Sequence, residues 1–413
     1  MIKSQYITKD KIIKLSVFLF GMFPLFPERI KGFPVLFLFV TSIYLTLKKG
    51  SVNYNFKEFL KLSSLYTISC LSILYTGSLY LPFNKLETSL SLIVVPISFM
   101  LLNLPKLNKS SIKLLAIYFT FSTSTHTLFS LFYYYQKGVF TPDQFKVNII
   151  RQLVTEIPFI NDHPIYISIF LGISILMSIR LLKLYEPAVK GLLLVSILIN
   201  IFHLLLLSSK GVTISITISG IILLFYNSNS KLLAFALAFC VLASFIASIF
   251  YFPNMERRFR ELGKITTYSQ LHTTNSSSIR IEIYKCAFKV IKQSPIIGYG
   301  WSKGEEKLIN CYTSKYMSDK KLNSHNQFIS FYLDGGIITF MTLIAFLSWQ
   351  FMHAIKNKKY LYFSILILFT LEMFSENILS RQSGVILFIF LISFFRQADP
   401  LISNAYLEMK KML

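Results

Sequence analysis

The sequence is divided by apolar runs that are long enough to cross a lipid bilayer. A transmembrane helix needs about 20 mostly apolar residues to span a hydrocarbon core of about 30 Å. Segments of that kind lie at 12–27, 33–47, 59–78, 87–103, 112–135, 164–182, 190–208, 212–226, 231–252, 326–350, 360–374 and 382–397. The sequence therefore predicts an all-α integral membrane protein with about twelve transmembrane helices.

Composition supports this prediction and excludes other classes. Of the 413 residues, 54% are hydrophobic and only 15% are charged, whereas a soluble domain carries about 25% charged residues. The net charge of +23 would suggest nucleic-acid binding in a polar chain. Here the basic residues form short clusters between apolar runs, without zinc-finger spacing or an RNA-binding aromatic motif. We expect no nucleic-acid partner, and we interpret the charge as a topology signal.

The distribution of Lys and Arg predicts the orientation, because positive residues near membrane ends stay in the cytoplasm. With the N-terminus inside, the short inner segments hold 21 Lys and Arg and the short outer loops hold eight. Both termini are therefore expected in the cytoplasm of a bacterial inner-membrane protein. We expect three parts: helices 1–9 in residues 1–252, a large periplasmic loop at 253–325, and helices 10–12 with a cytoplasmic tail in 326–413.

The large loop contains the most informative residues. A helix is expected after Ser278, which is a suitable N-cap, and it should end before Pro295. A flexible turn with Gly298 and Gly300 follows. The loop returns to the membrane at His325, so an imidazole is expected at the outer mouth of the tenth helix.

These residues resemble a known family. His325-Asn326, nine residues and then Gly336-Ile337-Ile338-Thr339 match the His-(Asn/Ser/Gln)-x9-Gly-x-x-(Gly/Thr/Tyr) signature of bacterial O-antigen ligases. The stretches Ser278–Tyr284 and Pro295–Gly300 look like the Arg-helix-Pro-x-x-Gly-x-Gly segment of the same ligase and polymerase superfamily. The motif-level resemblance covers about 210–340. Elsewhere it depends on the twelve-helix layout with a large late loop.

The resemblance implies a GT-C-type glycosyltransferase. Such an enzyme moves a polysaccharide from an undecaprenyl-pyrophosphate-linked donor to a sugar hydroxyl of lipid A-core, or another glycan acceptor, at the periplasmic face. The family reaction inverts the anomeric carbon and uses neither metal nor cofactor. By resemblance, Lys210 and Arg280 hold the pyrophosphate and His325 serves the acceptor hydroxyl. Position 210 departs from the family, which usually has Arg there, and Lys lacks the planar fork of a guanidinium.

The chemistry of these side chains agrees with those roles. Breaking a glycosyl-pyrophosphate bond places negative charge on the leaving group, and fixed cations stabilise that charge. Arg280 and Lys210 can supply the cations. The attacking hydroxyl must lose a proton, and a neutral imidazole such as that of His325 is a suitable base.

Other residues have both a functional and a structural interpretation. Asn326, Arg151 and His163 are candidates for substrate binding, although a structural role or contact with lipid headgroups is favoured for Arg151 and His163. His126 and His203 lie inside apolar helices, where a neutral, hydrogen-bonded role is favoured over a functional one.

Four more positions carry open alternatives. Glu372 and Glu376 could form a structural pair with Arg381 or support the basic site. Asp334, two turns into the tenth helix, has the same two interpretations. The sequence does not establish whether Cys286 and Cys311 are bridged.

Three other functions compete with the ligase. An O-antigen polymerase would use the same donor but join lipid-linked repeat units. A related transferase would modify protein hydroxyls. A polysaccharide or lipid transporter or flippase belongs to a different class, and it would favour charges near the bilayer centre and two similar halves. The candidates here cluster at the outer face instead.

Overall fold

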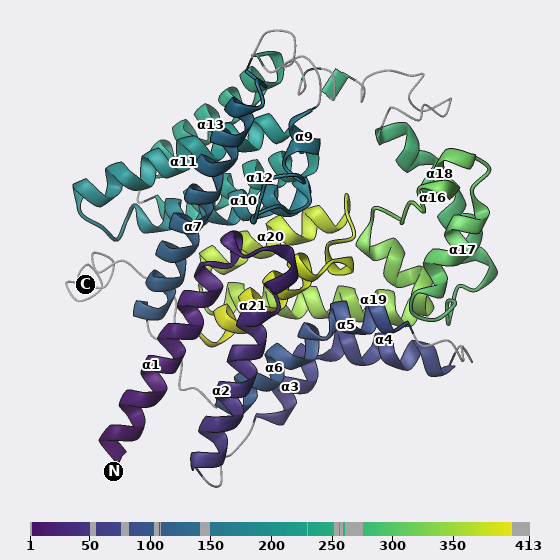
Figure 1. The fold of residues 1–413 in the computed structure, drawn as a ribbon, viewed down its shortest axis with the longest axis horizontal. Helices are drawn as coiled ribbons and strands as arrows, with labels where there is room; N and C mark the ends of the chain where they lie inside the picture. Colours follow the sequence, from purple (N-terminus) through teal and green to yellow (C-terminus); the bar gives the residue numbers. More distant parts are fainter. Residues whose placement is uncertain are drawn as a thin grey trace.

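The computed structural model describes residues 2–49, 55–75, 82–102, 107, 109–140, 149–228, 230–251, 256, 259–260 and 276–398. Within these ranges the named elements are α-helices and short 3₁₀ helices, and no strand occurs. Most helices form one bundle, and a separate helical group packs beside α19 (Gln327–Lys356) (Figure 1). The all-α class is thereby confirmed.

Each predicted apolar segment contains a helix. Two segments consist of two consecutive shorter helices, and the helix of a third, α19, is interrupted at Gly335 and Gly336. The elements are α1 (Ile2–Gly21), α2 (Phe33–Lys49), α3 (Phe56–Leu62) with α4 (Ser64–Tyr75), α5 (Phe83–Ser89) with α6 (Ser91–Leu102), α7 (Lys109–Gln136), α10 (Pro164–Leu181), α11 (Pro187–Leu207), α12 (Lys210–Asn227), α13 (Lys231–Tyr251), α19, α20 (Tyr360–Met373) and α21 (Gln382–Gln397). Seven described helical spans are long and apolar enough to cross a membrane, and three shorter helices are apolar as well. The number of twelve crossings stays a prediction.

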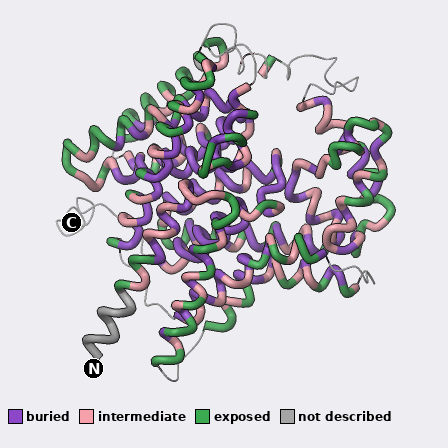
Figure 2. The backbone as a smooth tube through the Cα atoms, in the orientation of Figure 1, coloured by how far each residue is buried: buried purple, intermediate pink, exposed green. Residues whose placement is uncertain are grey.

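The helices at the periphery of the bundle expose many large apolar side chains, which is unfavourable in water. Leu192 of α11 and Phe239 of α13 are each more than 70% exposed. Figure 2 shows these two helices as largely exposed around a buried centre. Large continuous apolar surfaces mark sites of contact with membrane or protein. Lipid contact explains them here, because these helices are also long enough to span the bilayer.

The centre of the bundle is formed by α10, which is buried along nearly its whole length. It packs against α7, α11 and α12, and α12 packs in turn along α20. Close packing at Gly172 explains part of this arrangement, since a Cβ there would lie 2.6 Å from the side chain of Ile216. Helices α12 and α20, which contribute to the candidate site, are thus held by direct contact with α10.

A buried ion pair connects the N-terminal end of α10 to the rest of the bundle. The Lys31 ammonium donates to the carboxylate of Asp162, and both side chains are at most 2% exposed. Ser383 of α21 donates to the same carboxylate at 2.8 Å. The ammonium also lies 5.1 Å from the ring centroid of Phe170, a favourable cation–π contact. The pair therefore fixes the segment that precedes α10.

We expect Asp162→Ala to destabilise the protein by about 3–5 kcal/mol, because it leaves a buried ammonium without its carboxylate. The thermal unfolding midpoint in detergent measures this effect. Lys31→Met combined with Asp162→Leu should recover most of the loss, since no charge then remains buried. An Asp162→Ala protein that melts like the wild type would contradict the role assigned to the pair.

The helical group beside α19 belongs to the large loop. It comprises α16 (Ser276–Gln293), α17 (Lys303–Cys311) and α18 (Lys315–Asp319), which enclose a small apolar cluster of their own. The helix predicted after Ser278 is present, but it begins at Ser276, so the prediction that Ser278 is the N-cap is wrong. The loop between 260 and 276 and the expected tail after 398 lie outside the described residues.

Candidate functional site

Three cations from distant parts of the chain line one open cavity. They are Arg151 of α9 (Ile150–Leu153), Lys210 at the start of α12 and Arg280 of α16. Glu372 and Ser375 contribute to the wall. The structure therefore brings together three of the six residues that the sequence predicts to be catalytic or to bind substrate.

The turn between α11 and α12 positions two of these cations. Ser208 adopts a left-handed backbone (φ 49°), which lets α12 start only two residues later. The Arg151 guanidinium donates to the Leu207 carbonyl at 3.0 Å and to the Ser209 hydroxyl at 3.1 Å. Lys210 is 9% exposed, and its ammonium lies 3.4 Å from the Ser277 hydroxyl. Arg151 and Lys210 are therefore held at one turn beside the start of α16.

Arg280 is held by the segment that follows α20. Its guanidinium donates to the Ser375 carbonyl at 3.0 Å, and Tyr284, one helical turn later, donates to the Phe374 carbonyl at 3.3 Å. These two hydrogen bonds attach α16 to residues 374–377, a segment that we call the α20 turn. The remaining guanidinium donors are available to line the cavity.

A buried carboxyl group forms part of the same wall. Glu372 is 1% exposed and accepts hydrogen bonds from Ser215 at 2.8 Å and Ser375 at 3.2 Å. Three cations thus surround a cavity with one carboxyl group. A ligand with several negative charges would neutralise the excess positive charge of this cavity.

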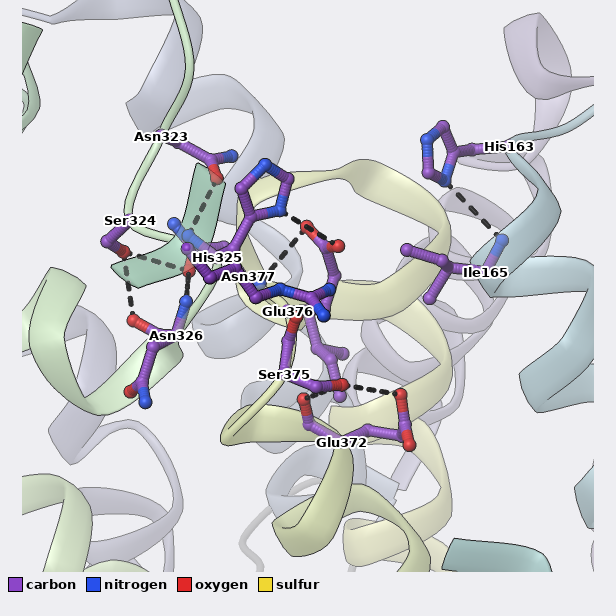
Figure 3. A network of polar contacts seen from close by, with 12 residues as sticks. His163, Ile165, Asn323, Ser324, His325, Asn326, Glu372, Ser375, Glu376 and Asn377 are labelled. Atoms are coloured by element: carbon purple, nitrogen blue, oxygen red, sulfur yellow. Dashed lines mark hydrogen bonds and ion pairs between the residues drawn. The ribbon is translucent and has the colours of Figure 1, made fainter. Parts of the chain in front are cut away.

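His325 lies above the α20 turn and pairs with Glu376. The Nδ1 atom of His325 is 3.2 Å from the Glu376 carboxylate, and the imidazole is 28% exposed while the carboxylate is 10% exposed. Figure 3 shows the ring directly over this carboxylate. Burial alone would raise the pKa of Glu376. The hydrogen bond and charge of His325, helped by Arg280 and His163, outweigh burial and lower it.

The lowered pKa of Glu376 decides which imidazole nitrogen carries the proton. An ionised carboxylate can only accept hydrogen bonds, so Nδ1 of His325 must donate to it. In the neutral imidazole Nε2 is then left as an acceptor. The pair therefore presents a base at the N-terminal end of α19.

The backbone at His325 is strained and held in place by amide side chains. His325 has φ 44°, a left-handed value that is unusual for a residue with a side chain. Its N–H donates to Asn323 at 3.0 Å. The side chain of Asn377, in the α20 turn, accepts from the Asn326 N–H at 2.7 Å and from the Ser324 hydroxyl at 3.0 Å. Strain of this kind persists where the surroundings determine it, and it is concentrated at functional sites.

Asn326, a predicted substrate residue, uses its side chain within the protein. Its Oδ1 accepts from the Ile329 N–H at 3.1 Å and caps α19, and its Nδ2 donates to the Phe374 carbonyl at 3.2 Å. These bonds orient the residue that precedes it. A direct contact of Asn326 with substrate stays a prediction.

His163 lies across the α20 turn from His325, at the N-cap of α10 (Figure 3). Burial, followed by the charge of Arg381, lowers the pKa of His163 to about 4. The neutral ring accepts weakly from the Ile165 N–H at 3.5 Å. It does not line the cation cavity, so its contact with substrate stays a prediction.

The other polar candidates are hydrogen-bonded inside the protein. His126 lies 3.1 Å from the Ile160 carbonyl, and His203 lies 3.2 Å from the Tyr134 hydroxyl. Asp334 accepts from the Ser302 N–H at 3.2 Å, at the start of α17. Among the described residues no group of three or more His, Cys, Asp or Glu could hold a metal ion. That the reaction proceeds without a metal ion stays a prediction from the resemblance.

The middle part of the chain is similar to known proteins. Residues 192–344 match the family model described as O-antigen ligase. This part of the chain is similar to the O-antigen ligase family. An uncharacterized protein of Haemophilus influenzae is 26% identical over 185 residues, which cover 42% of this chain and 45% of that relative. The chain therefore matches less than half of the relative's length.

The segment that matches the O-antigen ligase model contains Lys210, Arg280 and His325, but it ends before the α20 turn. Glu376 and Asn377 thus lie outside it. Glu376 was a candidate from sequence as a partner of Arg381 or of the basic site, whereas Asn377 was missed. The sequence does show a polar Glu-Asn pair between two apolar helices, which indicates a candidate functional position. Nothing in its spacing along the chain predicts that the pair contacts His325.

The two glycine motifs of the ligase resemblance pack against each other. Helix α19 is broken at Gly335 and Gly336, where Gly336 has φ 64° and ψ −155°. The Pro295 carbonyl accepts from the Ile337 N–H at 3.0 Å, and the Gly300 N–H donates to the Asp334 carbonyl at 2.7 Å. At the break, backbone N–H and C=O groups of α19 have no partner within the helix. They form hydrogen bonds with the backbone of residues 295–300 instead, and these bonds hold the end of the loop against α19.

We expect Gly336→Ala to undock the loop and abolish activity. A Cβ at Gly336 would lie 2.1 Å from the Ile296 carbonyl oxygen, and the left-handed φ alone costs about 1–2 kcal/mol for a residue with a side chain. Protease sensitivity of the loop in membranes measures the effect. Gly191→Ala is the matched control, because a Cβ there meets nothing within 4 Å. Equal protection of both variants would exclude the docking role.

Proposed function

We propose that this protein is a glycosyltransferase of the O-antigen ligase type. It transfers a polysaccharide from an undecaprenyl-pyrophosphate-linked donor to a sugar hydroxyl of lipid A-core, at the periplasmic face of the inner membrane. The observation that carries the proposal is the α20 turn. Through the Ser375 carbonyl it holds Arg280 of the cation cavity, and through Glu376 it holds the base His325.

The proposed mechanism follows from these two groups. The pyrophosphate of the donor binds Lys210, Arg280 and Arg151 in the cavity. The acceptor hydroxyl gives its proton to Nε2 of His325 while its oxygen bonds to the anomeric carbon from the face opposite the pyrophosphate. The bond between that carbon and the pyrophosphate oxygen breaks, and the electron pair leaves with the pyrophosphate. The cations stabilise this charge as it develops, and the configuration inverts.

Glu376 has a positioning role in this mechanism. Its carboxylate keeps the Nδ1 proton of His325 on the far side of the ring, so that Nε2 is free to accept. It also stabilises the imidazolium that forms when the hydroxyl proton is transferred. The proposal assigns it no contact with substrate.

Lipopolysaccharide gels of a deletion strain test the proposed function. We expect loss of all polymer from lipid A-core, with long chains still attached to the lipid carrier, because ligation is the final joining step. Core capped by a single repeat would show an O-antigen polymerase instead. An unchanged gel with altered solute uptake would replace both proposals with a transporter. Complementation with the wild-type chain should restore the full ladder.

A further inference from the structure

Two cysteines of the large loop lie against each other. Cys286 of α16 and Cys311, the last residue of α17, are 25 positions apart in the chain. The Cys286 thiol donates to the Cys311 carbonyl at 3.1 Å, and the Cys311 thiol lies 3.9 Å from the Cys286 carbonyl. Each sulfur therefore lies within 4 Å of the backbone of the other cysteine, and this proximity is a requirement for a disulfide.

The surroundings of this pair favour a covalent link. Both thiols belong to the small apolar cluster of the loop, with Ile283, Leu308 and Met317. A cluster of this size buries little apolar surface, and small domains outside the cytoplasm commonly use disulfides to compensate. The remaining cysteines lie elsewhere, Cys70 in α4 and Cys240 in α13.

We propose that Cys286 and Cys311 form a disulfide in the mature protein. This rests on the periplasmic placement of the loop in the proposed function, because cytosolic thiols stay reduced. The oxidant is a disulfide-bearing thiol oxidoreductase. The thiolate of Cys311, the more exposed of the two, attacks the oxidant's disulfide and expels one of its sulfurs as a thiolate. Cys286 then loses its proton and attacks the Cys311 sulfur, which releases the oxidant as a dithiol.

The order of these steps follows from the environment of each sulfur. Cys286 is 6% exposed, and burial raises its pKa to about 12, so it is a poor first nucleophile. Once formed, the bond joins α16, which carries Arg280, to α17, whose first turn is held by Asp334 of α19. It therefore links a cation of the cavity covalently to the helix group that docks on α19.

Thiol counting in the full-length protein tests the proposal. Cells are quenched with acid, and the denatured protein is labelled with a polyethylene-glycol maleimide that shifts its gel mobility once per free thiol. We expect two labels without reductant and four after reduction. Cys286→Ser should give three labels in both conditions, whereas the control Cys70→Ser should give one before reduction and three after. Four labels in unreduced wild-type protein would overturn the proposal.

A topology probe separates this outcome from failure of the proposed function. Thr313, an exposed residue beside α17, is changed to Cys in a chain whose four native cysteines are Ser, and intact cells receive a maleimide that cannot cross the inner membrane. Labelling of T313C together with four free wild-type thiols would reject the disulfide and keep the periplasmic placement. Absence of labelling would reject both. Polymer transfer on gels is an independent readout of the function itself.

Discussion

His325→Ala should lower the rate of polymer transfer by about 10²–10⁴-fold, because the variant lacks the base that accepts the acceptor proton. The change should appear in kcat, with little effect on the KM for the carrier-linked donor, since the cations of the cavity remain in place. A coupled assay of polymer transfer in membranes measures both constants. The amount of inserted protein, determined by immunoblot, corrects for expression.

Two companion variants make this result specific. Glu376→Gln keeps the size of the side chain but removes the charge that orients the imidazole, so its kcat should fall between those of the wild type and His325→Ala. His353→Gln changes a histidine at the opposite end of α19, and it should transfer polymer like the wild type. Wild-type activity in His325→Ala would eliminate its role as the base, and wild-type activity in Glu376→Gln would eliminate the positioning role.

Arg280→Ala should lower transfer by about 10²–10³-fold, because one fixed donor to the developing charge of the leaving group is lost. Unlike His325→Ala, it should also raise the KM for the donor, since the same guanidinium binds the ground-state pyrophosphate. Lys210→Met should act in the same direction. Lys210→Arg should be tolerated, because a guanidinium keeps the charge and offers a planar pair of donors that can bind phosphate in a bidentate way.

A charge change on the same helix is the control for this series. Lys289 lies on α16 and is exposed, so Lys289→Ala removes a cation from the loop without touching the cavity. We expect unchanged donor KM and kcat. A similar loss in Lys289→Ala and Arg280→Ala would mean that the general positive charge of the loop, and not the cavity, attracts the donor.

The helices could be predicted from hydrophobicity because each is a long apolar run, and all twelve predicted segments contain a helix. The interruptions within three of them were not predicted. One lies at Gly335 and Gly336 of α19, and the other two lie at Ser63 and Leu90, without Gly or Pro. Hydropathy averages over such positions, since an interruption of one or two residues does not alter the apolar content of the window.

The site could be predicted only in part. Motifs identified Arg280, Lys210 and His325, and the structure places Arg280 and Lys210 on one cavity with Arg151. The connection between the cavity and His325 depends on Glu376 and Asn377, which lie 51 residues after His325 and Asn326. A contact between segments so far apart is created by packing of α19 against α20. No local pattern encodes it.

Reconstitution of the purified protein tests the central claim most directly. Liposomes would contain the protein, an undecaprenyl-pyrophosphate-linked glycan and lipid A-core, and the joined product would be followed by gel and mass spectrometry. We expect glycan joined to lipid A-core with inverted configuration, and no product from His325→Ala. Joining of two carrier-linked glycans without use of lipid A-core, or equal product from His325→Ala, would contradict the account.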